Sequence, residues 1–303
     1  MISKNEFLIL SEIEKNEYNY TQRLLSERLG LSLGLINKYL KQLTESGYIK
    51  DMKLTKEGYD VLEPFRVKRA IFIAAGFGSR MLPVTLNTPK PLVKVHGKRI
   101  IETMLDAVVK VGIQEIFVVR GYLGECFDVL LKKYPNIKFF DNNMFNEGNN
   151  ITSAMLVKDF FANSYILDGD LVLKNDKLIT KYQYANNYLG IYKEVTDDWC
   201  LMTKGANLQI DNISVGGKNC YQWVGISYWD KESGQKLSED IPKVFGMPGG
   251  KERYWDQVAL EYCKNNYKVF VRECKEEDIV EIDSFKELKE IDKSYDVYYK
   301  HFV

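Results

Sequence analysis

The chain has 303 residues, of which 45% are apolar, so it is long enough for two domains and a substantial core. Lys and Arg together number 42 and so do Asp and Glu, which gives a formal net charge of zero. This balance gives no indication of a nucleic-acid or membrane-surface partner.

Cysteine and histidine usage argues against a structural metal. The five cysteines form no CxxC pair, and two histidines are too few for an ordinary zinc site. The first residues include an acidic Glu6, and no long uncharged apolar run follows. We therefore expect neither a signal peptide nor a membrane span, and a cytoplasmic location.

Residues 1–66 are predicted to form a small helical domain with a hairpin. Thr21 and Ser32 are placed to cap the second and third of three helices, and Thr55 opens a last helical turn after short strands at 47–50 and 52–54. Apolar residues recur at helical spacing and should face inward: Phe7, Leu10, Ile13, Leu24, Leu25, Leu29, Leu33, Ile36, Leu40 and Leu43. The order of elements resembles a winged helix-turn-helix domain of small bacterial regulators.

The role of this first domain stays open between two readings. The outward face of the third helix would carry Gly34, Asn37, Lys38 and Lys41, which suits a helix that reads a DNA groove. However, residues 1–66 hold ten basic and ten acidic residues, whereas phosphate contacts usually supply much of the affinity for DNA. We expect a regulatory or dimerisation role, with a homodimer as one form, and keep DNA binding as the alternative.

A linker at 63–67, which contains Pro64, should lead to a second domain over 67–303. Short apolar runs that read as strands alternate there with segments of helical spacing: strands at 70–73, 93–95, 115–119, 137–140 and 165–168, and helices at 101–108 and 127–133. This alternation predicts an α/β domain whose sheet is mostly parallel and covered by helices on both faces. In such sheets ligands bind at the carboxyl ends of the strands.

The first strand of this domain runs into a loop suited to phosphate. Small residues let the backbone amides approach an anion: Ala74, Ala75, Gly76, Gly78 and Ser79. Arg80 adds a guanidinium group, and Lys90 follows in a segment stiffened by Pro89 and Pro91. No Gly-Lys-Ser/Thr follows the glycines, so this is not a P-loop of the Walker A type. A nucleoside triphosphate is the expected ligand.

Residues 74–92 resemble the signature AAGxGxRxxPxTxxxPKPL of the nucleotidyltransferases that make NDP-sugars and CDP-alcohols, with Ile73 in place of the usual preceding Leu. The resemblance extends from about residue 67 to the C-terminus. It implies a Rossmann-like nucleotidyltransferase fold with a mixed, mostly parallel sheet. Arg80 and Lys90 would be the catalytic cations.

Two later segments should complete the nucleotide site. Asn149, Asn150 and Ser153 open a helix, and the resemblance implies that this segment lies against the nucleobase, although simple N-capping by Asn150 or Thr152 is an alternative. The strand at 165–168 ends in Asp168-Gly169-Asp170. Asp168 is expected to support the nucleotide site.

A magnesium ion is the expected cofactor. A carboxylate at a strand end facing a triphosphate suits Mg²⁺, and the metal-binding aspartate of the family aligns with Asp170. A second family aspartate matches Asp283, where a strand ends and an acidic helix begins. Asp283-Ser284 could instead be only a helix cap.

Aromatic residues concentrate between these two aspartates. The candidate acceptor-binding rings are Trp199, Tyr221, Trp223, Trp229, Tyr254 and Trp255, and Asp198 and Asp256 lie beside them in the sequence. Aromatic faces near carboxylates bind quaternary ammonium groups, although such residues more often pack a core. Where sugar-activating members carry Asn-x-Gly, this chain has Trp223-Val224-Gly225. The set is similar to that of bacterial phosphocholine cytidylyltransferases.

The sequence therefore predicts Mg²⁺-dependent transfer of CMP from CTP to phosphocholine. Three alternatives stay open: 2-aminoethylphosphonate or phosphoethanolamine as acceptor, a sugar-1-phosphate as acceptor, and a DNA-binding regulator that only senses a nucleotide. The residues alone do not distinguish CTP from UTP.

Overall fold

A computed structural model describes residues 2–15 and 20–296. The chain divides into two compact units: Met1–Arg66 together with Tyr182–Tyr184, and Val67–Lys181 together with Ala185–Val303. Within the described residues, no helix is both long enough and apolar enough to cross a membrane.

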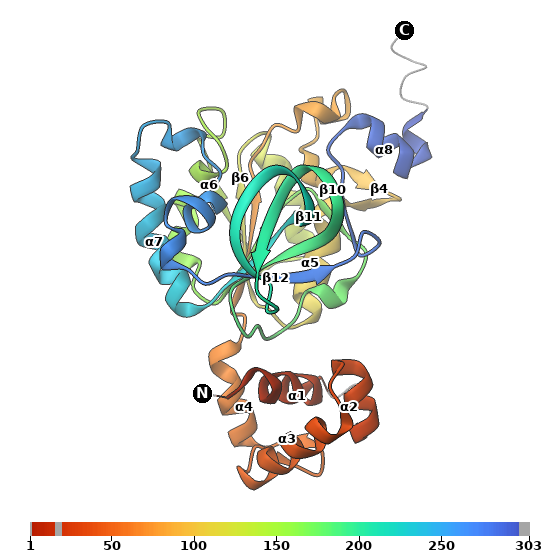
Figure 1. Ribbon diagram of the computed structural model, residues 1–303. Helices are drawn as coiled ribbons and strands as arrows, with labels where there is room; N and C mark the ends of the chain where they lie inside the picture. Colours follow the sequence, from red (N-terminus) through yellow and green to blue (C-terminus); the bar gives the residue numbers. More distant parts are fainter. Residues whose placement is uncertain (1, 16–19, 297–303) are drawn as a thin grey trace. The chain divides into compact units, whose positions relative to one another are not determined.

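The N-terminal unit has the predicted winged helix-turn-helix order (Figure 1). Thr21, Ser32 and Thr55 cap the second, third and fourth helices, each accepting a backbone N–H with its side-chain oxygen. The wing is a single antiparallel pair of short strands. The elements in order are α1 Lys4–Glu14, α2 Gln22–Leu29, α3 Leu33–Glu45, β1 Ile49–Lys50, β2 Lys53–Leu54 and α4 Lys56–Leu62.

The core of this unit is completed by a segment from much later in the chain. The ring of Tyr184 stacks on Phe65, with centroids 5.5 Å apart, and lies 5.3 Å from the ring of Phe7. The backbone N–H of Gln183 donates to the Phe65 carbonyl at 2.9 Å, and Tyr182 is buried in the same cluster. Nothing local marks residues 182–184 as part of the first unit, so the sequence analysis missed them.

The second unit is built on a seven-stranded mixed sheet in the order β10-β12-β11-β8-β3-β6-β7. Strands β8, β3, β6 and β7 run parallel to one another, whereas β11 runs antiparallel to β8. The mixed, mostly parallel sheet confirms the predicted fold class. The strands are β3 Arg69–Ala74, β6 Glu115–Arg120, β7 Ile137–Asp141, β8 Ser164–Asp168, β10 Asn187–Lys204, β11 Gln209–Trp229 and β12 Phe270–Cys274.

Helices cover both faces of this sheet (Figure 1). Alternate residues of β3 enter different cores: Phe72 packs in one cluster with α5 (Ile100–Lys110), and Ile71 in the other with α6 (Ile151–Val157) and α7 (Lys231–Phe245). This alternation is what a strand buried on both faces requires. Strands β10 and β11 form a long curled hairpin (Figure 1).

Three smaller elements lie beside the main sheet. Strand β4 (Lys94–Val95) pairs with β5 (Lys98–Arg99), and β9 (Leu171–Leu173) pairs with β13 (Ile279–Glu281). Helix α8 (Phe285–Ile291) follows β13 after a two-residue connection and Ser284.

One expected helix is wrong. The segment predicted as a helix at 127–133 forms 3₁₀ turns over Gly124–Lys132. The Arg120 guanidinium donates to the Gly124 carbonyl at 3.0 Å and pairs with Asp128. These contacts hold the start of the segment at the end of β6, and apolar spacing over so short a run does not distinguish 3₁₀ from α-helical turns.

We expect Tyr184→Ala to destabilise the N-terminal unit by about 2 kcal/mol, roughly half the effect of removing a fully buried ring. Faster native-state hydrogen exchange of amides in α1 and α4 would report the loss. Tyr192→Ala is the control, because the Tyr192 residue on β10 is 52% exposed. Equal exchange in Tyr184→Ala and the unsubstituted protein would show that residues 182–184 do not support this core.

Candidate active site

A cavity of about 570 Å³ lies where β3 and β8 end, as expected for the carboxyl ends of parallel strands. One part is lined by the signature loop and the segment before α6, and another by the β10–β11 hairpin. Its lining includes Ala75, Gly76, Arg80, Asn142, Phe145, Asn149, Asn150, Ser153, Asp168, Asp170, Asp198, Trp199, Trp223, Gly225, Tyr254, Asp256, Glu281 and Asp283.

The signature loop forms a second hollow of about 340 Å³ that shares Gly76, Arg80 and the metal-candidate aspartates with the first. Gly78 adopts φ +62°, and a Cβ there would lie 2.8 Å from Cβ of Lys90. Only glycine therefore allows Lys90 to pass so close to the loop. The hollow brings together further residues expected at the phosphates: Ala74, Gly78, Ser79 and Lys90.

Lys90 is the central cation of the site. Its Nζ lies 2.7 Å from Oδ2 of Asp170 and 2.9 Å from Oδ1 of Asp283, and the residue is only 7% exposed. Burial opposes its charge, but attraction to Asp170 and Asp283 outweighs burial and raises the pKa of Lys90. Arg80 Nη2 donates to the same Asp283 oxygen at 2.8 Å. The two predicted catalytic cations are thus paired with the two predicted metal ligands.

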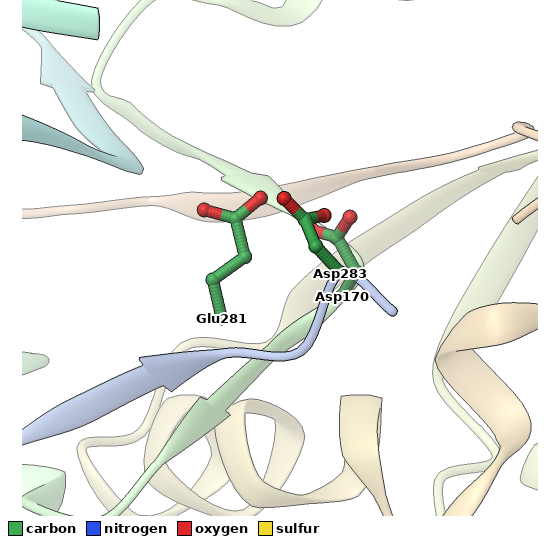
Figure 2. A group of neighbouring side chains, drawn as sticks. All are labelled: Asp170, Glu281 and Asp283. Atoms are coloured by element: carbon green, nitrogen blue, oxygen red, sulfur yellow. The ribbon is translucent and has the colours of Figure 1, made fainter. Parts of the chain in front are cut away.

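Three carboxylates converge on one point (Figure 2). Oxygens of Asp170, Glu281 and Asp283 lie within 4.8 Å of one another. Pairing of β13 with β9 places Glu281 opposite Leu171, directly after Asp170. Hard oxygen donors in this number suit a divalent cation that also takes phosphate oxygens, so these residues could hold the metal that the family uses.

The surroundings of Asp283 and Glu281 affect what their carboxylates can do. Ser284 caps α8 with its own hydroxyl, so the carboxylate of Asp283 is left to face Lys90. Burial, with repulsion from Asp170 and Asp283, raises the pKa of Glu281 to about 8. Glu281 was not predicted from the sequence. Its spacing was a usable signal, because side chains two residues apart on an extended segment, such as those of Glu281 and Asp283, point to the same side.

The nucleobase candidates line the cavity together. Asn149, Asn150 and Ser153 all contribute to it. Asn150 does not cap α6 with its side chain, because its Oδ1 accepts the Trp255 backbone N–H at 2.9 Å. Buried Asn142, which follows β7, lines the same region and was not found from the sequence. Its only signal was its place two residues after the predicted strand at 137–140.

Asp168 lines the cavity beside Gly225 of β11. A Cβ on Gly225 would lie 2.0 Å from Oδ2 of Asp168, so a larger residue there would displace this carboxylate. Burial and the nearby charge of Asp256 raise the pKa of Asp168 well above its usual range. The glycine of the Trp223-Val224-Gly225 segment therefore makes room for Asp168.

Three of the six candidate acceptor rings line the cavity: Trp199, Trp223 and Tyr254. The Trp199 ring lies 6.1 Å from Trp223 and 5.9 Å from Tyr254, in edge-to-face geometry. Two acids line the same end. Asp198 accepts from Gln222 at 3.0 Å, and Asp256 accepts from the Tyr188 hydroxyl at 2.7 Å.

The structure places the other three rings in the core instead. Trp229 and Trp255 are 0% and 2% exposed and lie 6.1 Å apart, edge to face. Tyr221 is buried and donates its hydroxyl to Glu273 at 2.8 Å. Spacing alone does not distinguish rings that pack against other rings from rings that face a cavity.

Comparison with known proteins agrees with this geometry. Residues 2–50 match the winged helix-turn-helix DNA-binding family model, and residues 69–195 match the nucleotidyl transferase model. A choline-phosphate cytidylyltransferase of Streptococcus pneumoniae is 33% identical over 226 residues, covering 74% of this chain and 97% of that protein. A 2-aminoethylphosphonate cytidylyltransferase of Lancefieldella rimae is 31% identical over 75% of this chain and 92% of its own length.

A solved structure of CTP:phosphocholine cytidylyltransferase from S. pneumoniae superposes with a TM-score of 0.69 at 33% identity, covering 76% of this chain and 99% of that one. The chain belongs to the nucleotidyl transferase family. It is a nucleotidyltransferase that carries a winged helix-turn-helix domain at its N-terminus.

We expect Lys90→Gln to raise the affinity of the nucleotide-free protein for Mn²⁺ on the order of tenfold, because the ammonium no longer competes for Asp170 and Asp283. Electron paramagnetic resonance of free Mn²⁺ during a titration measures this directly. Lys94→Gln, at an exposed lysine nearby, is the control. An unchanged Mn²⁺ affinity in Lys90→Gln would show that Lys90 does not act as the internal counter-ion of these carboxylates.

Proposed function

We propose that this protein is a CTP:phosphocholine cytidylyltransferase that forms CDP-choline and pyrophosphate with Mg²⁺. The observation that carries the proposal is the content of one cavity. A cationic phosphate loop and three convergent carboxylates lie in its wall and in the adjoining hollow, and three aromatic rings with Asp198 and Asp256 line the same cavity. The names of the relatives from S. pneumoniae and L. rimae support a cytidylyltransferase with an amino-alcohol or aminophosphonate acceptor.

The chemistry is direct displacement at the α-phosphorus of CTP. The acceptor phosphate has a second pKa of about 6, so it is mostly dianionic at neutral pH and needs no general base. Its oxygen bonds to the α-phosphorus as the bond to the leaving pyrophosphate breaks. Mg²⁺ held by Asp170 and Asp283 would supply charge neutralisation and a template for both phosphates.

The residues of the chain supply positioning and charge. Arg80 and the amides of the signature loop would hold the leaving pyrophosphate, and Lys90 would offset charge that develops at the α-phosphate. In the ligand-free structure these two cations contact the carboxylates instead. Binding of nucleotide would therefore exchange carboxylate partners for phosphate partners. Trp199, Trp223 and Tyr254 would surround the trimethylammonium group.

The second candidate is an acceptor with a primary ammonium group. The presence of Asp256 in the cavity lining favours it. A primary ammonium needs hydrogen-bond acceptors, and the carboxylates of Asp198 and Asp256 both line the acceptor end. 2-Aminoethylphosphonate is such an acceptor. The mechanism above would be unchanged.

For residues 1–66 we infer a regulatory or dimerisation role. Their charge is balanced, which makes unaided DNA affinity weak. The family model and the exposed Asn37, Lys38 and Lys41 on α3 support DNA binding as the alternative. A gel shift with the promoter of its own gene, with and without CTP, distinguishes the two.

The first test of function is pyrophosphate release with Mg²⁺ and CTP, with phosphocholine, 2-aminoethylphosphonate, phosphoethanolamine and glucose-1-phosphate offered in parallel. We expect phosphocholine to be preferred. Trp223→Ala should raise the KM for phosphocholine about tenfold without changing the KM for CTP, because a cation–π contact is lost. Trp229→Phe, at a ring outside the cavity, is the control.

Preference for a primary amine would establish the second candidate in place of the first. Turnover with none of the four acceptors would contradict the proposed function.

The acceptor step should depend on pH through Asp256. Burial raises the pKa of Asp256 to about 7, so its carboxyl becomes anionic as the pH rises through neutrality. If only the anion attracts the acceptor ammonium, kcat/KM for phosphocholine should rise roughly twentyfold from pH 6 to pH 8, about tenfold through Asp256 and about twofold through the acceptor phosphate. Asp256→Asn should retain only the roughly twofold rise from the acceptor phosphate. An identical pH profile in Asp256→Asn would contradict this role.

A further inference from the structure

A buried amide next to the nucleobase region has a fixed orientation. Asn142 is 3% exposed, and its Oδ1 accepts the backbone N–H of Met144 at 2.9 Å. Because that backbone group can only donate, the amide nitrogen must point the other way. Nδ2 donates to Oγ1 of Thr152 at 3.0 Å and to Oγ of Ser153 at 2.9 Å. Both N–H bonds of the amide are therefore used.

The orientation of Asn142 determines what the two hydroxyls can do. Thr152 accepts from Asn142 and donates its proton to the Asn149 carbonyl at 2.8 Å, so it has no proton left. Ser153 also accepts from Asn142 and cannot donate back to it. Among the described residues, Ser153 Oγ forms no hydrogen bond other than the one it accepts from Asn142. Ser153 is 2% exposed and lines the cavity, so its proton is available to the ligand.

The cavity that Ser153 lines also has small and aromatic residues in its wall. Ala75, Gly76 and Phe145 line it together with Ser153. A donor favours cytosine over uracil only at the ring nitrogen N3, because at position 4 cytosine has an amino group and uracil an accepting oxygen. N3 carries a lone pair in cytosine and a proton in uracil, whereas the neighbouring O2 is an acceptor in both.

We propose that Asn142 fixes Ser153 as a hydrogen-bond donor to N3 of the pyrimidine, and that this pair selects CTP over UTP. Ser153 is the specificity residue and Asn142 a positioning residue that acts through it. The inference rests on the proposed cytidylyltransferase function. The fold would select the base because it fixes the direction of the Ser153 O–H. When UTP is bound, this proton would face the N3 proton of uracil and would have no acceptor.

The test reverses the polarity with a substitution of equal size. In Asn142→Asp at pH 8.5, both carboxylate oxygens accept, so Met144 keeps its partner while Ser153 must donate to residue 142 and presents a lone pair to the base. We expect the ratio of CTP to UTP affinity to fall on the order of a hundredfold, with UTP binding strengthened. Isothermal titration calorimetry of each nucleotide, without acceptor, measures this apart from turnover.

The chain offers a matched control in Asn143→Asp, the same substitution at the exposed neighbouring residue. This variant should keep the unsubstituted CTP preference. Ser153→Ala is the second variant: it should weaken CTP binding on the order of tenfold and leave UTP binding unchanged. If Asn142→Asp does not fold, as judged by thermal unfolding, Ser153→Ala alone decides.

The outcomes separate this inference from the function on which it rests. A protein that prefers CTP, but whose CTP to UTP ratio is unchanged in Asn142→Asp and Ser153→Ala, overturns the inference and leaves the function intact. If Ser153→Ala weakens the binding of CTP and UTP equally, the Ser153 contact is at O2, and the inference is also overturned. Absence of CTP binding and turnover in the unsubstituted protein contradicts the proposed function itself.

Discussion

The contact of Lys90 with Asp170 and Asp283 is the interaction on which the site depends. It joins three segments that are far apart in the chain: the signature loop after β3, the end of β8 and the connection from β13 to α8. A buried ion pair adds little net stability, but removal of one partner leaves an uncompensated charge in a poorly solvated place. The ligand-free protein therefore holds its acids together with its own cations, in the position where phosphates and a divalent ion would replace them.

Charge is separated along the cavity. Arg80 and Lys90 lie near the loop amides, whereas Asp198 and Asp256 lie beside the aromatic rings. Asp170, Glu281 and Asp283 accompany the cations at the loop, so an anionic phosphate there would need the loop amides, Arg80, Lys90 and a divalent cation together, whereas a cationic acceptor group would meet Asp198 and Asp256. A neutral sugar would leave buried Asp256 without a counter-charge, and burial already raises the pKa of its carboxyl.

Features that depend on short spacing along the chain could be predicted, whereas features that depend on tertiary packing could not. The signature loop, Asp170 and Asp283 were expected together from strand ends, glycine spacing and the family resemblance, and they line one hollow. Trp229, Trp255 and Tyr221 could not be separated from Trp199, Trp223 and Tyr254, because whether a ring meets other rings or a cavity depends on how a long hairpin curls. Tyr184 and Asn142 were missed for the same reason, since their partners Phe65 and Ser153 are set by tertiary contacts.

In this cavity, ligands would be recognised by donors and acceptors that have no hydrogen-bond partner within the described part of the protein. The side chains of Asn142 and Thr152 donate all their N–H and O–H protons to neighbouring residues. They can therefore position those residues but cannot donate to a ligand. Ser153 retains one proton. A buried donor without a protein partner is costly in the empty protein, and that cost is recovered only by a ligand with an acceptor at that point. The same reasoning applies to Asp168, which Gly225 accommodates at the cavity wall: groups that the fold leaves incompletely satisfied are those that distinguish one ligand from another.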